Sequence, residues 1–214
     1  MTTNFRNAHL LTSMSAITEK VVSNRPVVDF MLRRCSLLAN HLVDPGPDDK
    51  ALNVILKIAT RVPNHEKLTP WSIKILRKAA QKDLASIYRT SFLKSKPDAS
   101  DAMVLAAKRQ MTQSPLLLVV IAQPDMDRLE EAPLIEQQMS AGVVCSNTLI
   151  AAAALGFGAQ WRIGRPAYDL AVHAALGLSE YDSIAGFLHI GSPTEPPRER
   201  RRPRLRDVVS EWTG

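Results

Sequence analysis

The chain has 214 residues, 45% of them hydrophobic, which is enough for one globular domain with its own core. Its formal charge is +6, and most of that charge comes from PRERRRPRLRD (residues 197–207), where six arginines stand against two acidic residues. A nucleic-acid-binding surface usually interleaves basic and aromatic residues, whereas aromatics make up only 5% of this chain and none lies in the arginine run. We therefore expect no nucleic-acid partner.

Cysteine usage and hydropathy indicate a cytoplasmic protein without a membrane partner. Cys35 and Cys145 belong to no CxxC pair or zinc-binding pattern, so we expect two buried, reduced thiols and no metal site. No run of 18 apolar residues occurs, which argues against a transmembrane helix. Residues 1–24 lack the features of a secretory signal and are expected to form an extension. The domain is expected at 25–214, with a basic arm from about residue 194.

Apolar periodicity predicts helices interspersed with strands along the rest of the chain. Helices are expected from Pro26, around 52–59, and over 77–94, 99–112 and 168–176, and strands over 72–76, 115–122, 159–164 and 183–191. The run PLLLVVIA, bounded by prolines, is typical of a strand that is buried on both faces. The pattern as a whole indicates an α+β or α/β fold in one domain.

A long apolar helix is predicted in the second half of the chain. Residues 139–156 are apolar almost all round and rich in small residues, and the helix is expected to start near Leu134. A helix of this kind often completes its burial against a second subunit. We therefore expect a homodimer.

Common catalytic and phosphate-binding motifs are absent from the sequence, among them GxGxxG after a strand, GxxxxGK[ST], GxSxG and HExxH. The first candidate binding segment is a cationic group at the end of the first predicted helix. Arg33 and Arg34 stand beside Cys35 and Ser36, and guanidiniums next to a hydroxyl can bind a phosphate. Alternatively, these cations only pair favourably with the C-terminus of the helix.

Two further segments carry polar chemistry. In RVPNHEKLTPW (residues 61–71), Arg61 and His65 flank Asn64, and the alternative interpretation is a polar loop with Trp71 in the core. In the second segment, Arg162 lies between the apolar Trp161 and Ile163 on a short strand. An arginine in that setting is expected to point at a charge or to reach the surface.

Five segments, in this order, resemble the FMN-dependent nitroreductases, in particular the compact branch of NAD(P)H nitroreductases. They are Arg34-Cys35-Ser36 with the following PGP loop, RVPNHEKLTPW, EQQMSAG (136–142), GFGAQWRIG (156–164) and GFLHIGSP (186–193). Each motif is weak alone, but their order and spacing are specific. The resemblance covers the chain from about Phe30 to its end.

The resemblance implies an α+β fold with a central, mostly antiparallel sheet flanked by helices, and a long buried helix at a homodimer interface. It also implies that FMN lies in a cleft at that interface. Arg34, Cys35 and Ser36 would bind its ribityl-phosphate end, with Arg33 as the alternative if the register slips by one residue. The basic arm would wrap over the partner and lend one arginine to the phosphate.

By the same resemblance, Arg61 and His65 would reach the flavin bound mainly by the other subunit. Trp161, Arg162 and Ile163 would line the isoalloxazine, and Arg162 is the candidate for stabilising the reduced flavin. NADH or NADPH would be the electron donor, and a small electron-poor molecule such as a nitro compound the acceptor, in a ping-pong cycle. No catalytic side chain is needed, because the flavin carries the chemistry.

The sequence departs from the family pattern at two positions. The usual Arg-Arg-Ser has Cys35 as its second member here, and Leu38 stands where many members have a basic residue. Three other functions remain as alternatives: an FMN-binding protein without turnover, a related flavoenzyme such as a reductive dehalogenase or a desaturating oxidase, and a nucleic-acid binder that uses the arginine run. An FMN-binding protein would contain flavin but would not oxidise NAD(P)H. A nucleic-acid binder would contain no flavin, and its binding would depend steeply on salt.

Overall fold

The computed structural model describes residues 24–214, so the expected extension over residues 1–24 lies almost wholly outside the described residues. The chain divides into two compact units, the first ending at Arg33 and the second spanning Arg34–Gly214. The described part of the first unit is helix α2 (Arg25–Arg33). Arg25 pairs with Asp29 at 2.9 Å across one turn of this helix, whose start near Pro26 was predicted.

A five-stranded sheet forms the centre of the second unit. Its order is β1-β5-β3-β2, with β4 also paired to β5, and all four pairings are antiparallel. The predicted antiparallel α+β architecture is therefore confirmed. The strands are β1 (Leu42–Val43), β2 (Trp71–Leu76), β3 (Leu116–Ala122), β4 (Gly158–Arg162) and β5 (Ser183–Pro193).

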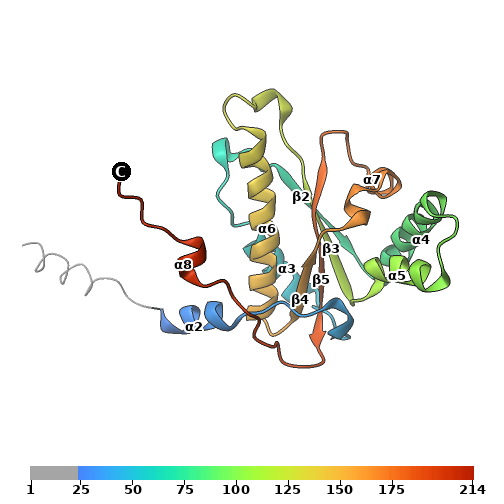
Figure 1. The fold of residues 1–214 in the computed structure, drawn as a ribbon, viewed down its shortest axis with the longest axis horizontal. Coiled ribbons are helices and arrows are strands. Elements are labelled where there is room, and N and C mark those ends of the chain that lie inside the picture. The colour runs from blue at the N-terminus through green and yellow to red at the C-terminus, as the bar shows by residue number, and fades with distance from the viewer. Residues whose placement is uncertain (1–23) are drawn as a thin grey trace, which may run out of the picture. The chain divides into compact units, whose positions relative to one another are not determined.

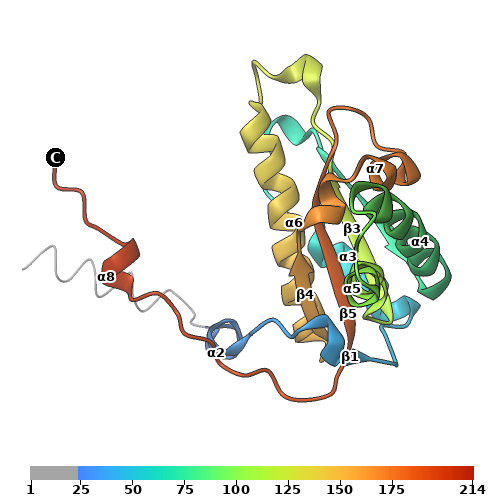
Figure 2. The ribbon, with the colours of Figure 1, turned by 45° about the vertical axis from the view of Figure 1, so that its right-hand side comes forward.

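Helices cover both faces of the sheet (Figures 1 and 2). One core packs α3 and α6 against Leu118 and Val120 of β3, and the other packs α4, α5 and α7 against Leu117 and Val119. All seven residues of β3 are buried, because both faces of this strand are covered. The helices are α3 (Asp49–Ala59), α4 (Lys78–Ser95), α5 (Asp101–Thr112), α6 (Leu134–Ala154) and α7 (Leu170–Leu176).

The ends of some elements differ from the sequence-based expectation. The helix predicted over 168–176 begins at Leu170, because the Asp169 carboxylate accepts hydrogen bonds from the backbone N–H groups of Ala171 and Val172 at 3.0 and 3.1 Å. The two-residue strand β1 and the short helix α8 (Leu205–Val208) were not predicted. Short 3₁₀ turns lie at Ala39–His41, His65–Lys67, Met126–Arg128 and Arg165–Tyr168.

Helix α6 starts at Leu134, as predicted, but a single chain buries only one of its faces. Ala141, Val144 and Cys145 are fully buried against the sheet. Ile135 and Met139 on the outward face are 62% and 64% exposed. This outward apolar surface is left uncovered within a single chain.

The two cysteines differ in their surroundings. Both are free thiols, but only Cys145 is buried, whereas Cys35 is partly exposed, so the expectation of two buried thiols is wrong for Cys35. Burial raises the pKa of Cys145 to about 12, which keeps this thiol protonated and inert. Within residues 24–214, no helix has the length and hydropathy needed to cross a membrane.

Candidate functional site

The segment that contains Arg34, Cys35 and Ser36 runs beside the free edge of β4. The Leu37 N–H donates to the Ala159 carbonyl at 3.1 Å, and the Ala39 N–H donates to the Gln160 side chain at 2.8 Å. A Cβ on Gly158 would overlap the Leu37 and Leu42 side chains, so a glycine is needed for this close approach. Two of the predicted groups, residues 34–36 and 161–163, are thus brought to the same edge of the sheet.

The basic arm contacts that same segment within its own chain. The Arg200 guanidinium donates to the Ser36 carbonyl at 3.3 Å, and the Arg202 guanidinium donates to the Cys35 thiol at 3.0 Å. Glu199 joins the arm to this segment because its carboxylate accepts from the Cys35 thiol at 3.8 Å, and within the arm it accepts from Arg202 Nε at 2.9 Å. Hydrogen bonds from the Arg200 backbone N–H and the Arg202 side chain lower the pKa of Glu199.

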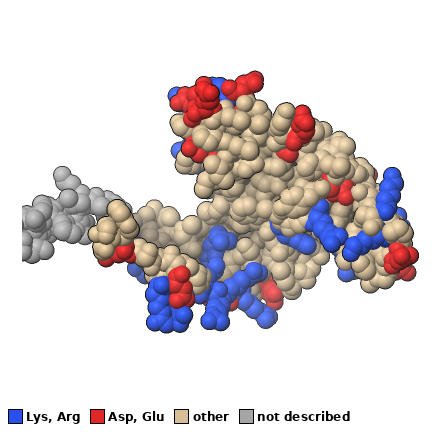
Figure 3. Space-filling view, turned by 45° about the horizontal axis from the view of Figure 1, so that its top comes forward, with Lys and Arg blue, Asp and Glu red and all other residues tan. Residues whose placement is uncertain are grey.

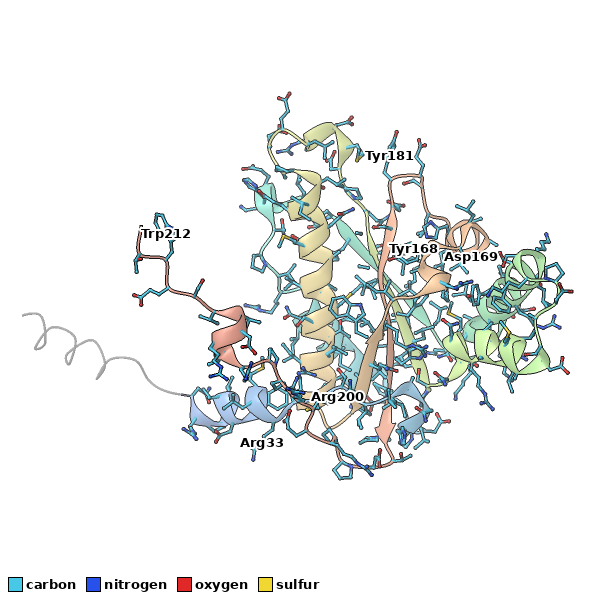
Figure 4. All side chains as sticks on the ribbon, viewed as in Figure 1. Arg33, Tyr168, Asp169, Tyr181, Arg200 and Trp212 are labelled. Atoms are coloured by element: carbon cyan, nitrogen blue, oxygen red, sulfur yellow. The ribbon has the colours of Figure 1, made fainter. Side chains whose placement is uncertain are left out.

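A hollow of about 390 Å³ lies between the arm and this segment. It is lined by Ser36, Leu37, Leu38, His41, Glu195, Arg198, Glu199 and Arg200. Basic side chains gather along the lower edge of the face in Figure 3, and Figure 4 labels Arg200 and Trp212 on the arm. The lining holds two guanidiniums and two carboxylates, and guanidiniums next to a serine can bind a phosphate through charge-assisted hydrogen bonds.

Trp161 and Arg162 point to opposite faces of the sheet. Trp161 is paired with Leu188 and Arg162 with Phe187, and directly paired residues lie on the same face. Leu188 belongs to the core under α3 and α6, and Phe187 to the core under α4, α5 and α7. The Trp161 side chain therefore lies on the α6 side, and the Arg162 side chain on the α5 side.

On the α5 side, Arg162 enters a polar cluster. Its guanidinium donates to the Gln113 side chain at 2.9 Å. Buried His189 lies on the same face, with its Nδ1 2.9 Å from the Ser114 hydroxyl. Burial and, to a smaller extent, the Arg162 charge together lower the pKa of His189 to about 4. Arg162 was expected to point at a charge or to reach the surface; it is partly exposed, and its hydrogen-bond partner is the neutral Gln113. Its role toward a flavin stays a prediction.

Arg61 and His65 lie along α6, Arg61 beside Asn147 and His65 at the N-terminal end, and His65 lies away from residues 34–36 of the same chain. His65 Nδ1 is 2.8 Å from the Glu136 carboxylate in the first turn of α6. Residues 34–36 lie near the start of β4, which follows the C-terminal end of α6. Since α6 has 21 residues, its ends are roughly 30 Å apart. The structure therefore does not bring His65 and Ser36 together within one chain.

The loop after His65 has an unusual backbone. Glu66, Lys67 and Thr69 have φ angles of 51°, 56° and 53°, a left-handed conformation that non-glycine residues rarely adopt. Such strain often marks a functional segment. Asn64 Oδ1 is buried without a hydrogen-bond partner among the described residues. Trp71 lies in the core, as the alternative interpretation of this segment expected.

A second hollow, of about 500 Å³, opens beside this loop on the exposed face of α6. It is lined by Pro63, Asn64, His65, Glu136, Met139, Ser140 and Val143. Its Glu136 and Ser140 come from the EQQMSAG segment, which sequence reasoning used for the resemblance without giving these residues a role. The remaining candidate, Arg33, ends α2, and its Nε donates to the Asp29 carbonyl at 3.1 Å.

Comparison with known proteins decides the family. The model of the "Nitroreductase family" matches residues 42–192. The chain belongs to the nitroreductase family. The "Putative NAD(P)H nitroreductase YdjA" of Escherichia coli (strain K12) is 30% identical over 155 residues, which cover 72% of this chain and 82% of that protein.

Solved structures agree on the fold of this nitroreductase family member. A nitroreductase-like family protein from Bacillus cereus matches with a TM-score of 0.75 and 21% identity, covering 91% of this chain and 100% of that one. A Desulfovibrio desulfuricans structure, described as a "putative nitroreductase in complex with fmn", matches with a TM-score of 0.65 and 21% identity, covering 90% and 100%. The predicted nitroreductase-like fold is confirmed, and the chain is an oxidoreductase.

Proposed function

We propose that this protein is an FMN-dependent oxidoreductase that transfers reducing equivalents from NADH or NADPH to a nitro compound or a similar small, electron-poor acceptor. The observation that carries the proposal is the hollow beside Ser36, which Arg198 and Arg200 line together with Glu195 and Glu199. The segment that contains Ser36 is hydrogen-bonded to β4, the strand that carries Trp161. The Arg198 and Arg200 guanidiniums of the hollow would bind the FMN phosphate, and Trp161 lies on the α6 side of the adjoining strand. The two free thiols support a reducing, cytoplasmic location.

The residues around this hollow suit the two ends of FMN. Arg34, Ser36, Arg200 and Arg202 would bind the ribityl-phosphate end, where their hydrogen bonds are charge-assisted. The half-buried Trp161 and the exposed Ile163 would border the ring system. When bound, FMN would take up hydride from NADH or NADPH and pass the electrons on to the acceptor in a ping-pong cycle.

A second copy of the chain would complete the site. Arg61 and His65 lie along α6, His65 lies away from Ser36 of its own chain, and the exposed face of α6 is apolar. In a two-fold dimer formed through this face, each chain presents the same surface to the other. His65 of one copy would then approach the phosphate-binding half-site of the other copy, which supports a homodimer with two shared sites.

The visible absorption spectrum of the purified protein, recorded before and after anaerobic addition of NADH or NADPH, tests the proposal. We expect a flavin band that bleaches on addition of the nucleotide. A flavin band that persists with both nucleotides would identify an FMN-binding protein without this activity. Absence of flavin even after incubation with excess FMN would overturn the proposal, and salt-dependent binding through the arginine run would then be examined.

The acceptor is tested after reduction of the flavin. Anaerobically reduced protein is mixed with a nitroaromatic compound, and reoxidation of the flavin band is followed. We expect complete reoxidation by the nitro compound. Reoxidation only by halogenated aromatic compounds would favour the dehalogenase-like alternative.

A further inference from the structure

Helix α6 holds alternate residues of the loop that leads to His65. The Asn147 side-chain amide donates to the Arg61 carbonyl at 3.0 Å, and the Ser140 hydroxyl donates to the Pro63 carbonyl at 3.1 Å. The third contact is the 2.8 Å pair between Glu136 and His65. One helix therefore fixes three successive odd-numbered residues of the RVPNH segment.

The spacing of these contacts follows from the geometry of the two segments. Glu136 and Ser140 are one helical turn apart, and Asn147 is seven residues further, so the three side chains lie on one face of α6. In an extended segment, alternate residues face the same side, and Asn64 between the contacts has the extended angles φ −143° and ψ 140°. The alternate residues of the extended loop therefore match side chains on one face of α6, and the loop docks on the helix in a specific register.

The Glu136 contact also determines which ring nitrogen of His65 carries hydrogen. An ionised carboxylate can only accept, so the Nδ1 atom that it contacts must be the donor. In the neutral ring, Nε2 is then the hydrogen-bond acceptor. Within residues 24–214, no group forms a hydrogen bond with Nε2, and His65 lines the 500 Å³ hollow on α6.

We propose that Glu136 is a positioning residue that holds His65 in its Nδ1–H form and leaves Nε2 for a ligand in this hollow, while Ser140 and Asn147 hold the loop backbone. Under the proposed function, on which this last step rests, that ligand is the flavin bound mainly to the second copy. The positive φ angles that follow at Glu66, Lys67 and Thr69 agree with a loop that is held in place from outside. Glu136 does not itself touch the cofactor in this arrangement.

The tautomer is measured by ¹⁵N NMR of the histidine rings in the full-length protein, with His65→Asn identifying the His65 signals among the five histidines. In the wild type we expect neutral His65 to be Nδ1–H. In Glu136→Ala we expect a shift towards Nε2–H. Glu130→Ala is the matched control, because Glu130 is exposed and makes no hydrogen bond or ion pair within the described part of the chain. An unchanged tautomer in Glu136→Ala overturns the proposal.

The functional step is measured separately by FMN titration of the same variants. We expect Glu136→Ala to bind FMN about tenfold more weakly and Glu130→Ala to bind it like the wild type, since a lost charge-assisted contact typically changes affinity by this order. Wild-type FMN affinity in Glu136→Ala, together with a changed tautomer, overturns the positioning role. Because the NMR measurement needs no flavin, a protein that never binds FMN refutes the proposed function while the tautomer result still stands.

Discussion

The Trp161 indole lies over Gly186 of the neighbouring strand β5, in the place that a side chain at residue 186 would take. The indole N–H donates to the Ala185 carbonyl at 3.0 Å, which fixes the ring across the strand. A Cβ on residue 186 would also lie 3.2 Å from the Cys145 sulfur of α6. The absence of a side chain at Gly186 is therefore what allows Trp161 to lie between β5 and the α6 side of the site.

Gly186→Ala is predicted to displace Trp161 and to destabilise the protein by about 1–3 kcal/mol, the usual cost of overpacking a core. Unfolding by urea measures the free energy, and FMN titration measures the effect on the proposed site. The double variant Gly186→Ala/Trp161→Leu is the control, because the smaller side chain leaves room for the new methyl group. We expect Gly186→Ala to lower the free energy of unfolding clearly less in the Trp161→Leu protein than in the wild type. An equal loss in both would show that the clash with the indole is not the cause.

Most of the fold followed from periodicity because the elements that carry it are long. PLLLVVIA was predicted to be a doubly buried strand, and β3 is buried at every residue because helices cover both faces. Strand β1 was missed because two residues cannot show an alternating pattern. The start of α7 was placed early because the sequence does not show that the Asp169 carboxylate caps residues 171 and 172.

The site was less accessible to sequence reasoning, because its contacts join distant parts of the chain. His65 was named as a candidate, but its partner Glu136 is 71 residues away and could be assigned only from the docking of the loop on α6. Trp161 and Arg162 were expected to act together on the flavin. Neighbouring residues of a strand point to opposite faces of the sheet, so Trp161 and Arg162 cannot share a face. Only the pairing of β4 with β5 shows that Trp161 is the one on the α6 side.

Arg162→Ala is predicted to lower FMN retention or to change the flavin reduction potential, if its charge acts on the cofactor through the sheet. Gln113→Ala is the matched variant, because it removes the hydrogen-bond partner of Arg162 and keeps the charge. Flavin content and anaerobic reduction kinetics are compared with urea stability for both variants. Wild-type flavin content and kinetics in Arg162→Ala would limit this arginine to a structural role beside Gln113.

The stability of the protein is predicted to fall as the pH drops from about 6.5 towards 4. In the folded state the pKa of His189 is lowered to about 4, whereas an unfolded histidine has a value near 6.5. Between these values the unfolded chain binds a proton that the folded chain excludes, so the full stability is present only above pH 6.5. We expect a loss of about 2 kcal/mol between pH 7 and pH 5 from this group alone.

His189→Gln tests the source of that pH dependence, because glutamine does not titrate and can still bond to Ser114. Urea unfolding at pH 5 and pH 7 is measured for the variant and the wild type. The difference between the two pH values is expected to be smaller in the variant by the contribution of His189. An identical pH dependence in both proteins would show that other groups cause it.

Arg202 is predicted to contribute to binding of the FMN phosphate. Arg202→Gln should weaken FMN binding about tenfold, the order of one charge-assisted hydrogen bond, and should leave riboflavin binding unchanged because riboflavin has no phosphate. Arg201→Gln is the control, because it removes the same charge from the neighbouring residue. Within residues 24–214 Arg201 makes no hydrogen bond or ion pair, whereas Arg202 pairs with Glu199. An equal loss of FMN affinity in both variants would indicate a general effect of charge.

The final prediction concerns the two-chain composition of the proposed site. His65→Ala and Ser36→Trp each disable one half-site, and each variant alone should lose most of its NAD(P)H oxidation. His65 lies at the N-terminal end of α6 and Ser36 near the strand that follows its C-terminal end, so a heterodimer would pair the two intact halves at one of its two sites.

Co-expression of the two variants, with different affinity tags to isolate the heterodimer, measures this directly. We expect the heterodimer to recover about half of the wild-type activity per dimer, because one of two symmetric sites is intact. Size-exclusion chromatography with light scattering checks that all three species are dimers. A heterodimer as inactive as both parents would contradict the shared site. It would mean that His65 and Ser36 serve the site of the same chain, although the structure holds them apart on α6 and beside β4.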